Sequence, residues 1–136
     1  MLINCTDTTV IKENLVSEES KLSIMTFNTE WLLGSQEQVK ALTKKGVWGL
    51  ESKDTETKIE KQHQAVATVI ARHSPDILCI QEVINEIAAR RLQKTLRNKN
   101  LNYELHFLES RDTYLEQDVV FLTKSNQGLI KEIKVT

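Results

Sequence analysis

The first regular pattern along the chain is an alternation of apolar and small polar residues from Leu22 to Phe27. A period of two is typical of a strand, and this strand ends at Asn28, where a loop is expected to begin. The preceding segment, residues 1–20, is polar and has no sustained period. We therefore expect a weakly ordered leader or an edge element over 1–20, and a folded domain over 21–136.

A long connection then runs from Thr29 to Thr57. Connections of this length inside a compact domain tend to be functional or disordered. This one contains Trp31 and Trp48, which could stack on bases or contact lipid, although packing onto the sheet is the more ordinary use of such rings. The sequence leaves these alternatives open.

Two helices and a buried strand follow. A row of residues with spacings of 4, 3 and 4 predicts an amphipathic helix over Thr57–Arg72, which Pro75 ends; the row is Ile59, His63, Val66 and Ile70. The run 76–82 is continuously apolar over residues 77–80, as expected for a strand buried on both faces. A second helix is predicted over 85–98, with Ile84, Ala88, Leu92 and Leu96 in one row.

Three further strands are predicted, over Tyr103–Glu109, Asp118–Thr123 and Leu129–Val135. The last two are joined by a turn signal at residues 125–128. The order strand, helix, strand, helix and then strands indicates an α/β or α+β fold with at least one right-handed βαβ unit.

Composition places the chain among ordinary folded proteins. Hydrophobic residues make up 40% and charged residues 27%, and 18 basic against 19 acidic residues leave a net charge of −1. No global field therefore favours a polyanionic partner or an anionic membrane. Cys5 and Cys79 do not suggest a disulfide framework, and the absence of a signal-like or membrane-spanning apolar run favours the cytoplasm.

Two strands end in residues that can bind a hard cation, Asn28 and Glu82. If a helical crossover joins these strands, they run parallel, and their carboxyl ends meet at the edge where open α/β folds bind ligands. Magnesium accepts one or two carboxylates and keeps waters and positions for phosphate oxygens. The alternative is ordinary: Asn after a strand is often a turn former, and Glu is often the first solvated residue.

Particular residues favour the first interpretation. The stretches Met25-Thr26-Phe27-Asn28-Thr29-Glu30-Trp31-Leu32 and Pro75-Asp76-Ile77-Leu78-Cys79-Ile80-Gln81-Glu82-Val83 closely resemble the two leading motifs of the endonuclease/exonuclease/phosphatase superfamily. That family includes deoxyribonuclease I, exonuclease III, bacterial sphingomyelinases and inositol polyphosphate 5-phosphatases. The resemblance implies that Glu82 is the principal metal ligand and that Asn28 orients the site near the metal and the attacked phosphate. It also implies Mg²⁺, with Mn²⁺ as a substitute.

A third stretch, residues 110–124, looks like the family's next substrate-facing loop and core strand. It makes Arg111, Tyr114, Gln117 and Asp118 candidate substrate-binding residues, with a solvated loop as the more ordinary interpretation. The family's later Gly-Asp-x-Asn and Ser-Asp-His motifs are absent. The resemblance thus covers the amino-terminal half of a DNase I-like domain: a partial two-sheet sandwich flanked by helices, half of a four-layer fold.

None of the three histidines replaces the family's catalytic histidine by motif. His63 is expected to be a half-buried packing residue, His73 to end a helix, and His106 to lie in a strand. The basic cluster Arg90, Arg91, Lys94, Arg97 and Lys99 could contact nucleic acid, but cations also gather at the end of a solvated helix.

Two functions remain open at this point. In the first, the complete protein is a metal-dependent phosphoesterase, nuclease-like in its hydrolysis of phosphodiesters, and this chain is an incomplete and inactive portion of it. A sphingomyelinase-type or phosphatase-type member of the same family would share these motifs, so the substrate is a phosphate ester, with nucleic acid one candidate. In the second, the chain is a non-catalytic module that binds a partner. A half-sandwich would leave an apolar sheet face uncovered, which predicts self-association.

Overall fold

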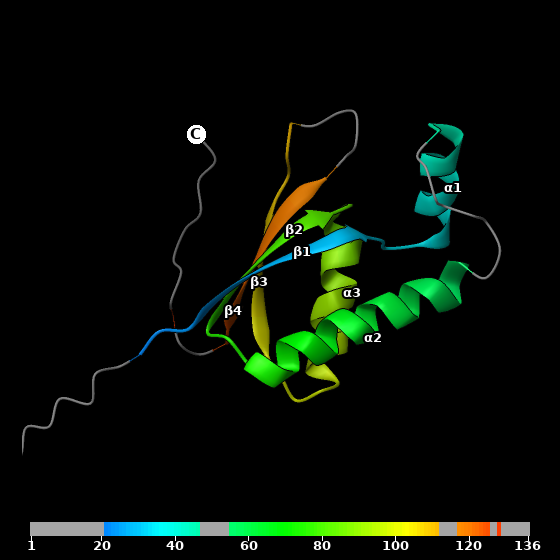
Figure 1. The fold of residues 1–136 in the computed structure, drawn as a ribbon. Helices are drawn as coiled ribbons and strands as arrows, with labels where there is room; N and C mark the ends of the chain where they lie inside the picture. Colours follow the sequence, from blue (N-terminus) through cyan, green and yellow to red (C-terminus); the bar gives the residue numbers. More distant parts are fainter. Residues whose placement is uncertain (1–20, 47–54, 112–116, 126–127, 129–136) are drawn as a thin grey trace, which may run out of the picture.

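The computed structural model describes residues 21–46, 55–111, 117–125 and 128, which form four strands and three helices (Figure 1). Their order is β1 (Ile24–Leu32), α1 (Gln36–Lys44), α2 (Thr55–His73), β2 (Ile77–Val83), α3 (Glu86–Arg97), β3 (Tyr103–Leu108) and β4 (Asp118–Lys124). The predicted leader, Trp48, Tyr114 and the predicted strand Leu129–Val135 lie outside the described residues. None of the described helices combines the length and the apolar composition needed to cross a bilayer.

The four strands form one sheet in the order β1-β2-β4-β3. The first two are parallel, and β4 is antiparallel to both of its neighbours. The chain between β1 and β2 contains α2, so the predicted strand–helix–strand connection and the parallel pairing are confirmed. The carboxyl ends of β1 and β2 therefore lie together at one edge of the sheet.

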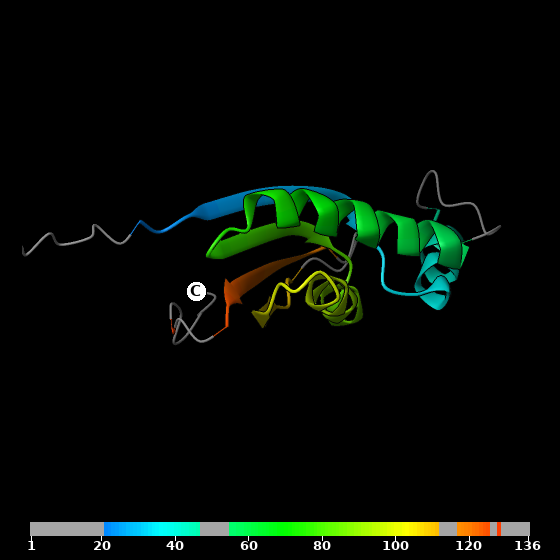
Figure 2. The same ribbon diagram turned by 90° about the horizontal axis from the view of Figure 1, so that it is seen from below.

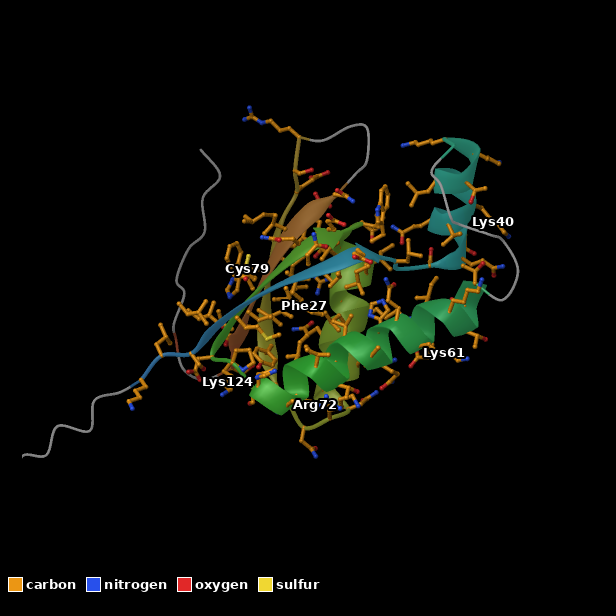
Figure 3. All side chains as sticks on the ribbon, in the orientation of Figure 1. Phe27, Lys40, Lys61, Arg72, Cys79 and Lys124 are labelled. Atoms are coloured by element: carbon orange, nitrogen blue, oxygen red, sulfur yellow. The ribbon has the colours of Figure 1, made fainter. Side chains whose placement is uncertain are left out.

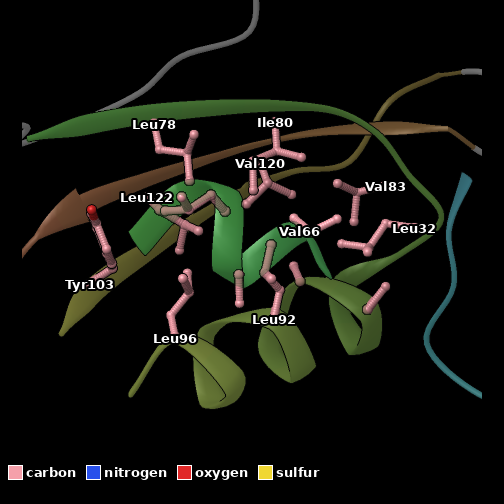
Figure 4. Close-up of a cluster of buried hydrophobic side chains, with 14 residues drawn as sticks. Leu32, Val66, Leu78, Ile80, Val83, Leu92, Leu96, Tyr103, Val120 and Leu122 are labelled. Carbon is pink, nitrogen blue, oxygen red and sulfur yellow. The ribbon is translucent and has the colours of Figure 1, made fainter. Parts of the chain in front are cut away.

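Both long helices pack on the same face of this sheet (Figures 1 and 2). The centre of the core consists of Leu78, Ile80, Val120 and Leu122 from the strands and Leu92 and Leu96 from α3, all with 0% exposure (Figure 4). Burial of an aliphatic side chain of this size contributes about 1.5–3 kcal/mol. These contacts fix the positions of α2 and α3 on the sheet. They therefore also fix the carboxyl end of β2, from which the chain leads into α3.

The opposite face of the sheet is only half-covered. Side chains of Ile77, Cys79 and Phe121 alternate with the buried ones and are partly exposed, and Ile24 is 64% exposed. The prediction that β2 is buried on both faces is therefore wrong for the described structure, because helices cover one face only. The Cys79 thiol is free.

A second correction concerns the predicted connection Thr29–Thr57. Strand β1 continues to Leu32, and α1 occupies residues 36–44. The helix begins at a capping box, in which the Ser35 side chain accepts from the Gln38 backbone while the Gln38 side chain accepts from the Ser35 backbone. The Ser-x-x-Gln spacing is a recognised helix start, and Val39 and Leu42 are its buried residues.

The predicted helices and strands otherwise lie close to their expected bounds. Helix α2 begins at Thr55 and ends at His73, two residues before Pro75, with exposed Lys61 and Arg72 labelled along it in Figure 3. Helix α3 follows the N-cap Asn85. The mixed α/β class, with helices packed on a sheet, is confirmed; the described residues form one sheet, whereas the prediction was a partial sandwich of two.

A polar clamp sets the register at the start of β1 and β2. The Ser23 backbone N–H and hydroxyl both donate to Asp76 Oδ2, at 2.9 and 2.7 Å, and Lys124 Nζ lies 3.1 Å from Asp76 Oδ1. These bonds, those from Ser23 first, hold the pKa of the Asp76 carboxyl well below its usual range. The clamp ties β1, β2 and β4 together at the edge opposite to Asn28 and Glu82 (Lys124 is labelled in Figure 3).

Candidate metal centre

Asn28 and Glu82 meet at the carboxyl ends of the two parallel strands. Asn28 Nδ2 donates a hydrogen bond of 2.9 Å to Glu82 Oε1. Asn28 pairs in register with Gln81, the residue before Glu82. The predicted convergence of an amide and a carboxylate at one edge of the sheet is therefore what the structure contains.

The orientation of the Asn28 amide is set by the backbone that follows it. Asn28 Oδ1 accepts a hydrogen bond of 2.9 Å from the Glu30 N–H. A backbone N–H must face the oxygen of the amide, so the nitrogen is the atom that faces Glu82. The geometry makes Asn28 a hydrogen-bond donor that fixes one carboxylate oxygen of Glu82.

A double irregularity of the strands presents these residues. Between the pairs Asn28–Gln81 and Leu32–Val83, residues 29–31 of β1 lie opposite the single residue Glu82. The register of β2 against β4 also shifts between Ile80 and Val83. Bulges of this kind re-aim side chains and are frequent beside active sites.

Three residues of this bulge adopt left-handed backbone conformations: Glu30 with φ 46°, Trp31 with φ 69° and Glu82 with φ 60°. Such values disfavour residues with a Cβ atom and persist where the surrounding contacts determine them. Among those contacts is the buried Thr29, whose hydroxyl donates to the Gln81 carbonyl at 2.8 Å and lies 3.3 Å from the Glu82 carbonyl oxygen. The apolar–polar pattern gave no signal for this role of Thr29.

The Glu82 carboxylate is not used in an ion pair with a lysine or arginine that the structure describes, so it can bind a metal ion. In the part of the chain that the structure describes, the ion pairs of lysine and arginine use other carboxylates, those of Glu56, Glu60, Asp76 and Glu86. No group of three or more His, Cys, Asp or Glu side chains gathers among the described residues. One carboxylate with an orienting amide fits magnesium, which takes few protein ligands and retains waters, better than zinc, which requires three or four.

The candidate substrate-binding residues that the structure describes differ in exposure. Arg111 is exposed, Gln117 is partly buried, and Tyr114 lies outside the described residues. Asp118 is buried, with 7% exposure, and its Oδ1 accepts a hydrogen bond of 2.6 Å from the Ser110 N–H. That bond ties the beginning of the β3–β4 connection to the start of β4. The substrate-contact role of all four residues stays a prediction.

The histidines lie apart from Glu82. His73 is the exposed last residue of α2, and His106 Nε2 lies 3.2 Å from the Thr123 hydroxyl, on the residue of β4 that pairs with Ile77 at the start of β2. His63 is fully buried rather than half-buried, and its Nε2 lies 2.7 Å from the Leu33 carbonyl oxygen. Burial lowers the pKa of the His63 imidazole.

Part of the basic cluster is neutralised by neighbouring acids. Arg90 pairs with Glu86 one helical turn away, and the partly buried Arg91 pairs with Glu56 and Glu60 at 2.6 and 2.9 Å. The two pairs of Arg91 tie α3 to α2. They support a packing role for Arg91 over a free nucleic-acid contact.

Comparison with known proteins gives structural resemblance only. No family model matches the sequence, and no curated protein matches it. Truncated TDP2 of Caenorhabditis elegans is similar at 19% identity and a TM-score of 0.39, over 76% of this chain and 30% of that protein. ANGEL2, a 2′,3′-cyclic phosphatase solved with adenosine-2′,3′-vanadate, is similar at 16% identity and a TM-score of 0.42, over 76% of this chain and 27% of its own. The chain thus spans less than a third of the length of either structure.

Proposed function

We propose that this chain carries the cation-binding edge of a Mg²⁺- or Mn²⁺-dependent phosphoesterase. In this proposal Glu82 is the metal ligand and Asn28 holds its carboxylate in position. The observation that carries the proposal is the 2.9 Å hydrogen bond from Asn28 to Glu82 at the ends of two parallel strands. The carboxylate stands on a bulge at this sheet edge, without an ion pair to any lysine or arginine that the structure describes.

The chain's own residues would act by orientation. Because Asn28 engages Oε1, the second oxygen of Glu82 is the one that can turn to a cation. A bound divalent ion supplies a Lewis acid that polarises a phosphoryl oxygen and stabilises the leaving group. The substrate class is a phosphate ester, with a nuclease-like phosphodiester as the first candidate. The Asn28 amide oxygen can also serve as a metal ligand only if it is shared with the Glu30 N–H.

Cation binding by the 136-residue chain tests the site directly. Mn²⁺ titration followed by electron paramagnetic resonance is expected to show one site, which Glu82→Gln abolishes. Asn28→Ala is expected to weaken it by about 10–100-fold, the cost typical of losing a partner that orients a ligand. Glu86→Gln, a change of the same chemistry on an exposed first-turn residue of α3, is the matched control and is expected to leave the affinity unchanged.

Activity is tested in the full-length protein. Hydrolysis of bis(p-nitrophenyl) phosphate is expected to require Mg²⁺ or Mn²⁺ and to be lost in Glu82→Ala. Unchanged metal-dependent hydrolysis in Glu82→Ala would remove the assignment of Glu82.

The half-covered sheet face favours a second candidate, a non-catalytic module that pairs with a second copy of itself. Ile24, Ile77 and Phe121 lie on that face, where Ile24 is largely exposed and the other two are partly exposed. Sedimentation velocity of the chain is then expected to show a dimer that Phe121→Lys dissociates. A monomer at all concentrations would eliminate this candidate, as would hydrolysis of a phosphodiester by the isolated chain.

A further inference from the structure

The segment after the bulge is held by helix α2 through side chains. Strand β1 is an edge strand of the described sheet, so the backbone groups on its outer side have no neighbouring strand. Gln62 supplies the missing partners: its Nε2 donates to the Trp31 carbonyl at 3.0 Å, and its Oε1 accepts from the Leu33 N–H at 3.3 Å. A side-chain amide carries the same donor and acceptor as a peptide group, so Gln62 takes the place of a strand neighbour.

The next residue of α2 continues this attachment. His63 is buried, and its Nε2 lies 2.7 Å from the Leu33 carbonyl oxygen, so that nitrogen carries the proton and donates. On the inner side of β1, the Ile84 N–H donates to the Leu32 carbonyl at 3.1 Å. Residues 31–33 are thus hydrogen-bonded on both sides. The backbone of Ile84, directly after β2, holds one side, and the side chains of Gln62 and His63 hold the other.

A continuous series of contacts connects the hydrogen bonds of Gln62 and His63 to Glu82, the candidate metal ligand. Gln62 fixes the Trp31 carbonyl, and Trp31 and Glu30 both have left-handed φ values. That conformation of Glu30 directs its N–H to Asn28 Oδ1, and the other end of the same amide donates to Glu82. Without the hydrogen bonds of Gln62 and His63, Glu30 and Trp31 would be free to relax to ordinary extended conformations, since left-handed conformations persist only where contacts enforce them.

We propose that Gln62 and His63 are positioning residues that hold the bulge at 29–31 in the conformation that orients Asn28 toward Glu82. Neither side chain contacts Glu82, and their effect passes through the backbone of Trp31 and Glu30. The consequence for cation affinity rests on the function proposed above, whereas the positioning itself does not.

The test compares Gln62→Met with Gln64→Met. Both variants replace a glutamine of α2 by an unbranched side chain of similar length. Gln64 differs from Gln62 in that it is exposed and its side chain donates a hydrogen bond to Glu60 of the same helix. In Gln62→Met, the Glu30 amide is expected to exchange with solvent several-fold faster, and the Asn28 side-chain amide signals are expected to shift in the nitrogen–proton spectrum. The amide of Leu78, in the core, is expected to keep its exchange rate. Gln64→Met is expected to leave all three readouts unchanged.

Mn²⁺ affinity provides the second readout, with an expected loss of about tenfold in Gln62→Met, typical for a residue that acts behind a ligand. If wild-type protein binds no Mn²⁺ at Glu82, the proposed function fails, while the exchange rates still decide the positioning. Unchanged Glu30 and Asn28 signals in a folded Gln62→Met protein would overturn the positioning. Gln62→Glu is the second variant: it keeps the acceptor for Leu33 but loses the donor to Trp31, and it must give the same changes.

Discussion

Replacement of Asn28 by aspartate reverses the central contact of the site. The change keeps the size of the side chain, but it puts a carboxylate oxygen where Nδ2 now lies, 2.9 Å from Glu82 Oε1. The Glu30 N–H still has an oxygen to bond. Asn28→Asp therefore removes one hydrogen bond and adds one like-charge contact without creating a cavity.

The size of the effect follows from that distance. Two unit charges about 3 Å apart repel by about 1.4 kcal/mol in surroundings like water, and more at lower dielectric. The lost hydrogen bond adds about 1 kcal/mol, because the pair is exposed to solvent and its strength is reduced accordingly. The free energy of unfolding at neutral pH should fall by about 2 kcal/mol, and Tm by about 8 °C, for a domain of this size.

Urea and thermal denaturation without divalent cations measure this loss. Millimolar Mg²⁺ is expected to restore stability at neutral pH, since two carboxylates and a cation attract. Asn85→Asp is the control: Asn85 is the N-cap of α3, where aspartate is an equally good cap, and it should change stability by less than about 0.5 kcal/mol.

Wild-type stability of Asn28→Asp at pH 7, in the absence of divalent cations, would refute this reasoning. It would mean that the side chains of residues 28 and 82 do not meet in solution. Destabilisation that Mg²⁺ does not reverse would leave the contact intact but count against a cation at Glu82.

Three further predictions concern the surroundings of the site. Because burial lowers the pKa of His63, the unfolded chain takes up a proton below about pH 6.5 that the folded chain does not. The free energy of unfolding should therefore decrease as the pH is lowered below that value. His63→Gln should lack this component in urea denaturation from pH 5 to 8, and equal slopes for both proteins would contradict it. Gly34→Ala should lower the free energy of unfolding by about 2 kcal/mol, because the new Cβ would lie 2.9 Å from the Ala88 backbone nitrogen; a fully stable variant would show that α3 yields at this point. Glu30→Gly should leave stability within about 0.5 kcal/mol of wild type or raise it, since glycine tolerates φ 46°, whereas Thr26→Gly in the regular part of β1 should cost about 1 kcal/mol; equal losses would argue against the left-handed conformation of Glu30.

Some features of the fold were predicted correctly because they depend on neighbours along the chain. The spacing of Ile59, Val66 and Ile70 identifies the buried face of α2, and the apolar run before Glu82 identifies β2. A helix between two strands implies parallel pairing, and parallel pairing places both carboxyl ends at one edge. The meeting of Asn28 and Glu82 was expected from these local patterns together with the resemblance of the two strand motifs, because the patterns alone left a turn former at Asn28 as an alternative.

Other features were missed although the local signal existed. Ser35 and Gln38 have the spacing of a capping box, but residues 29–57 were predicted as one connection. Gly34 lies where α3 and the Gln38 side chain approach too closely for a Cβ atom. The approach of α3 involves residues more than fifty positions away, which no local pattern reports.

Periodicity and chain order are local properties, so they were enough to predict the core strands, the two long helices and the polar residues at the strand ends. The direction of the Asn28 amide is not local: its nitrogen, not its oxygen, faces Glu82 because the Glu30 N–H takes the oxygen in the folded chain. The tertiary structure also decided that Gln62 and His63 serve the backbone of β1 rather than simply one face of a helix. These roles depend on hydrogen bonds between segments about thirty to fifty residues apart, and the directions of such bonds exist only once the helix and the sheet have packed.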